Sequence, residues 1–275
     1  MSLAGTSVRD AIDSAVIALT AAGCDTPRLD AEVLLAAAMG VDRAALIADP
    51  SRELTSEQAG VFRDWAFRRR DREPVAYIVG RQGFRWLDLH VDGRVLVPRP
   101  ETEHLVEAAL TLPEGARVVD VGTGSGAVAL ALKSERPDLA LVATDVSQAA
   151  LAVARGNAER LGLDVSFLAG DLLEPVAGPV DAVVSNPPYV REGERLPPDV
   201  ARYEPHVALF AAGEGFGVIE RLVPQAAAAG AAFLALEVGE GQARTVAARV
   251  REAGFDDVGV VRDYAGIERV VVGRR

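Results

Sequence analysis

The sequence has 275 residues, enough for one large domain or for a medium-sized domain together with a small one. With 49% hydrophobic and 25% charged residues it has an ordinary globular composition, and its net charge of −11 argues against a protein that binds polyanions. The single cysteine, Cys24, excludes an intramolecular disulfide framework and a cysteine-based zinc site, and we expect no metal.

The beginning of the chain lacks the features of a secretory signal, which are a basic stretch followed by an unbroken apolar core. Along the rest of the sequence, no apolar run approaches the roughly 20 residues that a membrane-spanning helix needs. We therefore expect a cytoplasmic protein without a membrane contact.

Residues 1–75 predict a small domain built from helices only, because apolar residues recur there at helical spacing. Thr26-Pro27 indicates a helix start, with threonine as the cap and proline in the first helical position. Thr55 and Gln58 have the spacing of a capping box and indicate another start. This part carries no catalytic pattern of its own.

One helix of this part ends in four arginines: Arg68, Arg69, Arg70 and Arg72. The simpler interpretation is that cations are favoured at a helix C-terminus by the helix dipole. The alternative is a patch for a protein or RNA partner. The simpler interpretation is favoured, and the alternative stays open at this point.

Residues 76–98 are predicted to form a linker that contains a β-hairpin. Apolar and polar residues alternate over 84–91 and again over 95–97, and Asp92-Gly93 between them is a typical turn. A lone hairpin is marginal in water, so we expect it to pack against another part of the chain.

Strand and helix patterns alternate in the remaining chain, which is typical of a parallel sheet. The predicted strands lie at 117–121, 139–144, 165–169, 180–185, 231–238, 257–262 and 268–273. The predicted helices lie near 125–135, 147–161, 216–229 and 241–253. We therefore predict an α/β fold with a Rossmann-like, seven-stranded sheet, preceded by the small helical domain and the hairpin linker.

The first of these strands runs into a glycine-rich turn, residues 122–126, and then into a helix. Glycines let the backbone approach a ligand closely, and a helix N-terminus offers free N–H donors. The turn also satisfies a relaxed dinucleotide-binding pattern, so by itself it does not identify the ligand.

Acidic residues follow three successive strands. Asp120 lies beside the turn, where a carboxylate suits a cationic or hydroxyl-rich ligand better than a pyrophosphate. Asp145 ends the next strand, where an acid can bind ribose hydroxyls. Asp171 is placed to meet an adenine amino group, with Leu172 beside it as a packing surface. Each acid alone is explained as well by a cap or turn, but their joint placement predicts one nucleoside site.

The fourth strand ends in a motif that organises the whole prediction, residues 185–189. Pro187 and Pro188 cannot continue a central strand, so they form a stiff lip at its carboxyl end, where α/β proteins bind ligands. The Asn186 side chain and the Pro187 carbonyl offer two hydrogen-bond acceptors, and Tyr189 offers a flat face. Such a set suits a planar –NH2 group.

The combination of Asp120, the glycine turn, Asp145 and residues 186–189 resembles S-adenosylmethionine-dependent methyltransferases that act on a planar amide or amino nitrogen. Nearly the whole chain is similar to the protein-(glutamine-N5) methyltransferases of class-1 peptide chain release factors, the PrmC/HemK family. The motif at 186–189 is shared with DNA adenine methyltransferases. The resemblance also includes residues 73–80, 83–84, 97–103, 203–205, 208–209 and 263–266, and of these 98–103 and 203–205 are much more specific to the family.

The resemblance implies methyl transfer from S-adenosylmethionine, leaving S-adenosylhomocysteine, to N5 of the glutamine in the Gly-Gly-Gln motif of release factors, in support of translation termination. It implies catalytic roles for Asn186, Pro187, Pro188 and Tyr189. The residues that it implies for cofactor binding are Asp120, Gly122, Thr123, Gly124, Ser125, Gly126, Asp145, Asp171, Leu172 and Asn186.

The implied domains are a helical, release-factor-binding domain at 1–75, the linker at 76–98 and the methyltransferase domain at 99–275. Arg99, which stands between two prolines, and Glu237, which ends a later strand, are candidates for shaping the substrate side. A structural role explains each of them as well.

Two other functions compete with this interpretation. A nucleic-acid amino-methyltransferase of the adenine N6 type would share the chemistry of residues 186–189, but it needs a positive groove and a flipped base. Acidic residues outnumber basic residues both before and after Gly80, which argues against a nucleic-acid methyltransferase. We therefore expect no direct nucleic-acid partner. A non-enzymatic binding protein is disfavoured because the acidic residues and the lip are all present.

Overall fold

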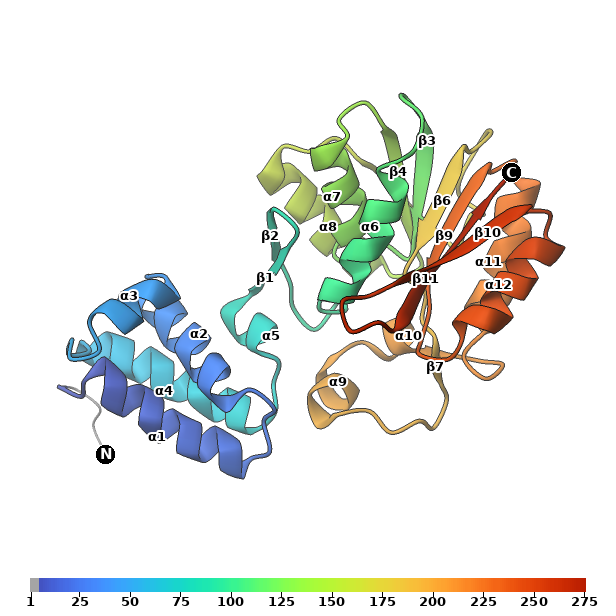
Figure 1. Cartoon of the computed structure of the whole chain (residues 1–275). Coiled ribbons are helices and arrows are strands. Elements are labelled where there is room, and N and C mark those ends of the chain that lie inside the picture. The colour runs from blue at the N-terminus through green and yellow to red at the C-terminus, as the bar shows by residue number, and fades with distance from the viewer. Residues whose placement is uncertain (1–4) are drawn as a thin grey trace. The chain divides into compact units, whose positions relative to one another are not determined.

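The structure is a computed structural model that describes residues 5–275. The chain divides into two compact units, which are treated separately (Figure 1). The helical unit comprises Met1–Gly80 together with Leu196–Tyr203, and the α/β unit comprises Arg81–Arg195 together with Glu204–Arg275. The segment Leu196–Tyr203, which the sequence interpretation left in the methyltransferase part, thus clusters with the helices.

The helical unit contains only helices among its described regular elements, as the sequence predicts. They are α1 (Val8–Ala21), α2 (Pro27–Met39), α3 (Arg43–Ala48), α4 (Ser56–Arg70), α5 (Val75–Val79) and α9 (Pro198–Tyr203). The buried residues of α1 to α5 form one apolar core that includes Leu19, Leu34, Leu35 and Phe62.

Both predicted helix starts are present, with different details. The capping box of α4 is complete, because Gln58 N donates to Thr55 Oγ1 at 3.2 Å and Thr55 N donates to Gln58 Oε1 at 3.1 Å. Thr26 precedes α2, but its hydroxyl donates to Asp30 Oδ1 at 2.8 Å instead of capping the helix. Pro27 therefore provides the local start signal, since its fixed φ suits the first helical position.

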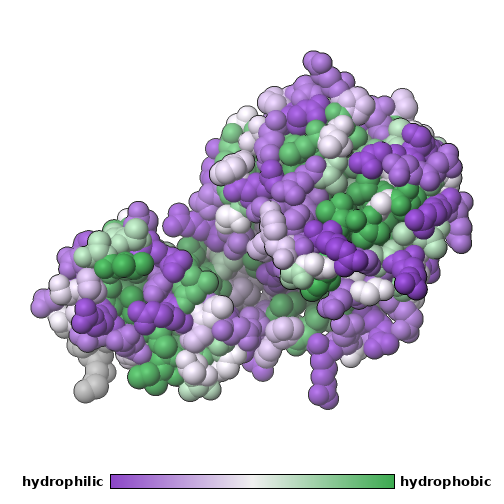
Figure 2. All heavy atoms as spheres, viewed as in Figure 1, coloured by the Kyte–Doolittle hydropathy of each residue, from purple (hydrophilic) through white to green (hydrophobic). Residues whose placement is uncertain are grey.

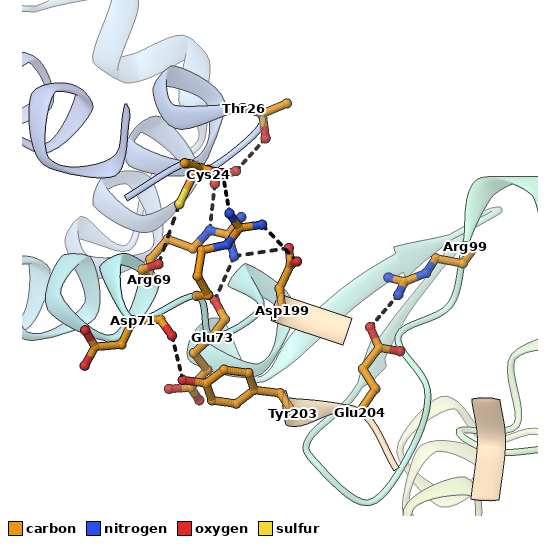
Figure 3. A network of polar contacts seen from close by, with 12 residues as sticks. Cys24, Thr26, Arg69, Asp71, Glu73, Arg99, Asp199, Tyr203 and Glu204 are labelled. Carbon is orange, nitrogen blue, oxygen red and sulfur yellow. Dashed lines mark hydrogen bonds and ion pairs between the residues drawn. The ribbon is translucent and has the colours of Figure 1, made fainter. Parts of the chain in front are cut away.

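The arginines that end α4 mostly find partners inside the helical unit (Figure 3). Buried Arg69 donates through Nε to Asp30 Oδ2 at 2.7 Å, and Arg72 donates through Nη2 to Asp199 Oδ1 at 3.0 Å. Arg68 forms an ion pair with Glu73. These contacts favour a structural role for the cluster over a patch for a partner.

The linker does contain a two-stranded hairpin, but its turn differs from the prediction. Strands β1 (Arg81–Phe84) and β2 (Leu87–His90) pair antiparallel, with Phe84 opposite Leu87. The turn is therefore Arg85-Trp86, and the prediction of a turn at Asp92-Gly93 between strands is wrong.

Tertiary contacts explain this shift. Arg85 adopts a φ of 50°, and its N–H donates to Glu103 Oε1 at 2.9 Å while its guanidinium contacts Glu107 and Glu135. Asp92 instead closes a local turn after the hairpin, where its carboxylate accepts from the backbone N–H and the guanidinium of Arg94.

The α/β unit is organised around one seven-stranded sheet in the order β10-β11-β9-β6-β3-β4-β5 (Figure 1). The strands are β3 (Arg117–Val121), β4 (Ala140–Asp145), β5 (Ser166–Ala169), β6 (Ala182–Ser185), β9 (Phe233–Glu237), β10 (Asp257–Arg262) and β11 (Glu268–Arg274). The first five are mutually parallel, and β11 runs antiparallel to both β9 and β10. All seven strands of the sheet were predicted, so the Rossmann-like α/β fold is confirmed.

Helices cover both faces of this sheet, because side chains alternate along each strand. Val118 and Val184 pack on the side of α6 (Glu103–Ala109) and α7 (Ala127–Glu135). Val119 and Val183 pack on the side of α11 (Gly217–Ala228) and α12 (Ala243–Glu252). The central strands, buried on both faces, read in sequence as continuous apolar runs for this reason.

The remaining elements of the α/β unit lie around the ends of the sheet. They are η1 (Pro100–Thr102), α8 (Gln148–Leu161), β7 (Val190–Arg191), α10 (His206–Leu209) and β8 (Phe210–Ala211), with β7 and β8 forming a small parallel pair. Strand β3 has β4 on one side and β6 on the other, so the direction of the winding reverses there. In open α/β sheets such a switch point, at the carboxyl ends of the strands, is the usual place for a ligand.

On the face seen in Figure 2, hydrophilic residues are spread over the surface of each unit, and hydrophobic residues form separate patches among these hydrophilic residues. Among residues 5–275, none of the helices has the length and apolar character that crossing a membrane would require.

Candidate active site

A cavity of about 420 Å³ opens at the carboxyl ends of the central strands. Its wall includes residues that follow β3, β4, β5 and β6, so it lies at the switch point of the sheet. Further wall residues come from Arg94 to Leu96, after the hairpin, and from the region of α10. Of the residues predicted for the nucleoside, Asp145, Asp171 and Leu172 thus line the same cavity as residues 186–188 of the predicted lip.

The glycine turn after β3 presents its backbone to this cavity. Gly122 and Gly124 have φ values of 73° and 56°, which favour glycine, and a Cβ at either position would meet nothing within 4 Å. Gly122 N and Thr123 N both donate to Thr144 O, at 2.8 and 3.0 Å, which ties the turn to the end of β4. The turn therefore leaves open space in front of Gly122 and Gly124, both of which line the cavity.

Gly126 serves a different purpose, the close packing of the start of α7 against α8. It precedes α7 with a φ of 85°, and a Cβ there would lie 2.9 Å from Leu130 Cδ1 and 3.3 Å from Ala154 Cβ. Gly126 and the buried Ser125 and Thr123 are not among the described residues that line the cavity. Their predicted contacts with a cofactor stay a prediction.

Asp120 is likewise turned inward. Its side chain is on the face of β3 that α7 covers, it is 1% exposed, and its Oδ2 accepts from Thr123 Oγ1 at 2.7 Å and Ala129 N at 3.2 Å. Burial raises the pKa of this carboxyl to about 6. Asp120 braces the glycine turn in this way, and its predicted contact with a cofactor stays a prediction.

Asp145 lines the cavity at the end of β4. Its Oδ2 accepts from Gly124 N at 2.9 Å and its Oδ1 accepts from Ser147 N at 2.8 Å, which holds the carboxylate in one orientation. Burial raises the pKa of Asp145, while the two backbone N–H groups counteract this rise. A fixed carboxylate with remaining lone pairs can accept hydrogen bonds from a pair of hydroxyls.

Asp171 and Leu172 both line the cavity after β5. Asp171 forms an ion pair with Arg221, another wall residue, so its carboxylate has a partner across the cavity wall. Leu172 is 8% exposed and has a φ of 50°, an unusual value for leucine that turns the chain at this point. The pair offers one polar group and one apolar surface to the cavity, and its predicted contact with an adenine stays a prediction.

The lip follows β6 and contributes Asn186, Pro187 and Pro188 to the cavity wall. It is anchored by the preceding residue, since Ser185 Oγ donates to Val121 O at 2.7 Å at the end of β3. The Asn186 side chain donates through Nδ2 to Thr102 Oγ1 at 3.1 Å. With the nitrogen engaged in this bond, the side-chain oxygen of Asn186 is left as an acceptor.

Tyr189 is held firmly but is not among the described residues that line the cavity. Its carbonyl accepts from Gln242 Nε2 at 3.0 Å, and a Cβ at Gly215 would lie 2.3 Å from that same oxygen. Its ring packs against Gly239, where a Cβ would approach Tyr189 Cδ2 to 3.1 Å. Burial, followed by the charge of Glu237, raises the pKa of Tyr189 to about 12, so its hydroxyl stays protonated at neutral pH. Its predicted packing on a substrate stays a prediction.

Glu237 ends β9 and is buried behind the lip, with 2% of its surface exposed. Burial raises its pKa to about 7, against the opposing effects of the Thr102 hydroxyl, Arg269 and the Asn186 amide. The sequence marked Glu237 as a candidate, but Thr102 only as part of a family segment. Nothing in the local pattern indicates that η1 places Thr102 beside Asn186.

Arg99 pairs with Glu204, which is 6% exposed and comes from the segment 203–205 (Figure 3). The same carboxylate accepts from Val97 N at 3.4 Å. Pro205, the next residue, lines the cavity, as do Val207, Ala208 and Phe210. This apolar wall was missed in the sequence, because α10 is too short to show a helical period.

Two family models match this sequence. One is described as the PrmC N-terminal domain and matches residues 10–80, and the other is described as the methyltransferase small domain and matches residues 101–238.

Individual relatives match over nearly the whole chain. The release factor glutamine methyltransferase of Koribacter versatilis is 42% identical over 279 residues, covering 98% of this chain and 99% of that protein. The protein of the same name from Yersinia pestis is 43% identical over 256 residues, covering 91% and 93%. A crystal structure of a methyltransferase from Pyrococcus furiosus has a TM-score of 0.53 at 20% identity, covering 68% of this chain and 88% of that one, and it shows the shared fold.

Proposed function

The chain belongs to the release factor glutamine methyltransferase family, and from this premise we propose that it methylates N5 of the glutamine in the Gly-Gly-Gln motif of class-1 release factors. The methyl donor is S-adenosylmethionine and the product is S-adenosylhomocysteine. The reaction supports translation termination and belongs in the cytoplasm, where release factors act. The observation that carries this proposal is the cavity that the diproline lip shares with the glycine turn and Asp145.

The residues of the cavity fit S-adenosylmethionine. Asp145 is oriented by Gly124 N and Ser147 N and has acceptor capacity left for the two ribose hydroxyls. Gly122 and Gly124 leave room for close approach of the amino-acid portion. Asp171 and Leu172 provide a polar and an apolar neighbour for the adenine. When bound, this cofactor supplies a methyl group that is already activated by the sulfonium centre.

The lip aligns the amide that receives the methyl group. A carboxamide nitrogen is a poor nucleophile, because its lone pair is delocalised into the carbonyl. Asn186 Oδ1 and the Pro187 carbonyl accept its two N–H bonds, which fixes the amide plane and increases the electron density on nitrogen as positive charge develops. The proton that leaves the nitrogen after transfer goes to water, and no strong general base is required.

The two units have different tasks under this proposal. The α/β unit holds the cofactor and the lip, and the helical unit, with the linker at 76–98 between them in sequence, binds the release factor. The match of residues 10–80 to the PrmC N-terminal domain supports this division. The lip, the cofactor wall and the hydrogen bond that orients Asn186 all lie within the α/β unit.

Incubation with labelled S-adenosylmethionine tests the function directly. Release factor should take up label, whereas release factor with its Gly-Gly-Gln glutamine replaced and duplex DNA should not. Asn186→Ala should lower the rate by about 100- to 1000-fold, a loss typical of a removed electrostatic contact in a transition state. Calorimetry should show cofactor binding by this variant unchanged. Label in DNA but not in release factor would overturn the proposal, and full activity of Asn186→Ala would refute the role of the lip.

A further inference from the structure

We propose that Thr102 and Glu237 are positioning residues that orient the side-chain amide of Asn186, so that its oxygen and not its nitrogen faces the substrate. This inference rests on the proposed function, because it concerns the same lip. An asparagine amide can rotate by half a turn with little change of shape, and then it presents two donors instead of an acceptor. A flipped Asn186 would oppose the –NH2 of a carboxamide with another –NH2, and no hydrogen bond could form.

The first step of the argument is the bond between Asn186 and Thr102. Asn186 Nδ2 donates to Thr102 Oγ1 at 3.1 Å, and Thr102 is buried, with 4% of its surface exposed. A threonine hydroxyl can accept or donate, so this contact alone does not determine which end of the amide faces it. Something must direct the hydroxyl hydrogen of Thr102 away from Asn186.

Glu237 supplies that direction. The Thr102 hydroxyl and the Asn186 amide both lie beside its carboxyl and act to lower its pKa, and Glu237 is 2% exposed. An ionised carboxylate only accepts hydrogen bonds. When the Thr102 hydrogen is directed to the carboxylate, Thr102 Oγ1 can only accept, and the side of Asn186 that faces it must be the NH2 group. The chain Glu237–Thr102–Asn186 therefore has a single direction.

A second observation supports a purpose for Glu237 beyond packing. Its Oε2 is buried and has no hydrogen-bond partner among the described residues. A buried carboxyl with an unsatisfied oxygen is costly, and such a group is expected where function retains it.

Charged and titratable groups around Glu237 come from several elements. Arg269 on β11 favours the ionised form, Glu101 on η1 disfavours it, and Tyr189 after β6 faces the same carboxyl. Burial dominates and raises the pKa of Glu237 to about 7. Once protonated, Glu237 can donate to Thr102, and the single direction of the chain is lost. The turnover rate should therefore rise with pH through this region.

The experiment compares three variants with matched controls. Thr102→Val removes the hydroxyl at constant shape, Thr102→Ser retains it, and Glu237→Gln replaces an acceptor-only group by an amide. Thr111→Val and Glu252→Gln are the same exchanges at exposed positions outside the site. For each protein, kcat and KM are measured with release factor across a pH series, cofactor affinity by calorimetry, and melting temperature by scanning fluorimetry.

We expect Thr102→Val and Glu237→Gln to lower kcat by about 10- to 100-fold, with cofactor affinity unchanged. Thr102→Ser should retain kcat within about threefold, and Glu237→Gln should lose the rise of kcat with pH. A double variant that combines Thr102→Val with Glu237→Gln should have a kcat no lower than that of the less active single variant. Both residues act on Asn186 through one chain of hydrogen bonds, so their effects should not add.

Three results would overturn the inference. These are wild-type kcat in Thr102→Val, an unchanged pH profile in Glu237→Gln, or parallel losses of kcat, cofactor affinity and melting temperature in Thr102→Val and Thr102→Ser alike. The failure of the proposed function looks different, because it appears in the wild-type protein as label in DNA and none in release factor. An inactive Asn186→Ala beside a fully active Thr102→Val would remove only the roles of Thr102 and Glu237.

Discussion

Two carboxyl groups of the α/β unit are almost entirely removed from water. Asp120 is 1% exposed and Glu237 is 2% exposed, and burial raises their pKa values to about 6 and about 7. Asp120 is compensated by hydrogen bonds from Thr123 Oγ1 and Ala129 N. Glu237 retains an unsatisfied oxygen, so its burial should reduce stability when the group is charged.

The effect of pH on stability follows from the direction of the shift. The pKa of Glu237 in the folded protein is about 7, above its ordinary value of 4.5, so the folded state binds this proton more tightly than the unfolded state. The resulting stabilisation is complete below the unfolded pKa and is lost as the pH rises through the folded pKa.

Glu237→Gln should therefore stabilise the protein in alkaline solution while it impairs turnover. We expect the free energy of unfolding to rise by about 1–3 kcal/mol at about pH 8 and to differ little from the wild type at about pH 5. Urea unfolding at the two pH values measures the difference, with Glu252→Gln as the control. An equal effect at both pH values would show that ionisation of Glu237 is not the cause.

At the scale of elements, strand β3, the glycine turn and helix α7 together shape one wall of the cavity. The glycines of the turn have different roles, since Gly122 and Gly124 face open space whereas Gly126 lies close to Leu130 in α7 and to Ala154 in α8. The sequence pattern alone does not distinguish the roles of Gly122, Gly124 and Gly126. Only the packing shows that one of them is required by the core.

Gly126→Ala should thus be more costly than the backbone conformation alone explains. A left-handed residue with a Cβ costs about 1–2 kcal/mol, and the approach of 2.9 Å to Leu130 Cδ1 adds strain, so we expect a loss of about 2–4 kcal/mol. Gly162→Ala has a similar φ of 66° but open space around it, and it should show only the backbone cost. Chemical denaturation compares them, and equal losses would exclude a packing contribution.

The hairpin of β1 and β2 is an element whose turn the local sequence does not predict. A hairpin is present in the linker, but the predicted first strand, 84–91, contains its turn at Arg85-Trp86, and 95–97 forms no strand. Arg85 is held at the turn by carboxylates from α6 and α7. Asp92-Gly93 is the stronger local turn signal. Contacts with residues 18 to 50 positions away decide the register, and no local pattern contains them.

For the molecule as a whole, the division of the chain is not linear. The segment Leu196–Tyr203, which follows the lip in sequence, belongs to the helical unit. There Asp199 lies 3.0 Å from Arg72 Nη2 and 3.6 Å from Arg69 Nη1, and the Tyr203 hydroxyl donates to Asp71 O at 2.9 Å (Figure 3). One stretch of the catalytic part of the sequence thus helps to hold the helices together.

Asp199→Asn should weaken the helical unit. Burial acts to raise the pKa of Asp199, but the hydrogen bond and charge of Arg72, with the charge of Arg69, outweigh it and lower the pKa. A lowered pKa means stabilisation that is present above the unfolded pKa and lost as the pH falls through the folded value. We expect a loss of about 1–3 kcal/mol at neutral pH that shrinks below about pH 3.

Hydrogen exchange of the amides in α4 measures this loss where it should occur. Asp64→Asn, an exposed carboxylate in the same helix paired with Arg63 at 3.5 Å, should change exchange little. Faster exchange confined to the α/β unit would contradict the assignment of Asp199 to the helical unit.

The sequence by itself determined the helical N-terminal part, all seven strands of the main sheet, and the residues 186–188 and 145 as neighbours in one site. It could do so because hydrophobic periodicity, glycine turns and diproline breaks are local signals, and parallel strands bring their carboxyl ends to one edge. Tertiary structure alone decided the turn of the hairpin, the inward role of Asp120, the placement of 196–203, and the contact of Thr102 and Glu237 with Asn186. Each of these depends on contacts between side chains that are distant in sequence. Packing and burial determine such contacts, and the local periodicity of the sequence does not reveal them.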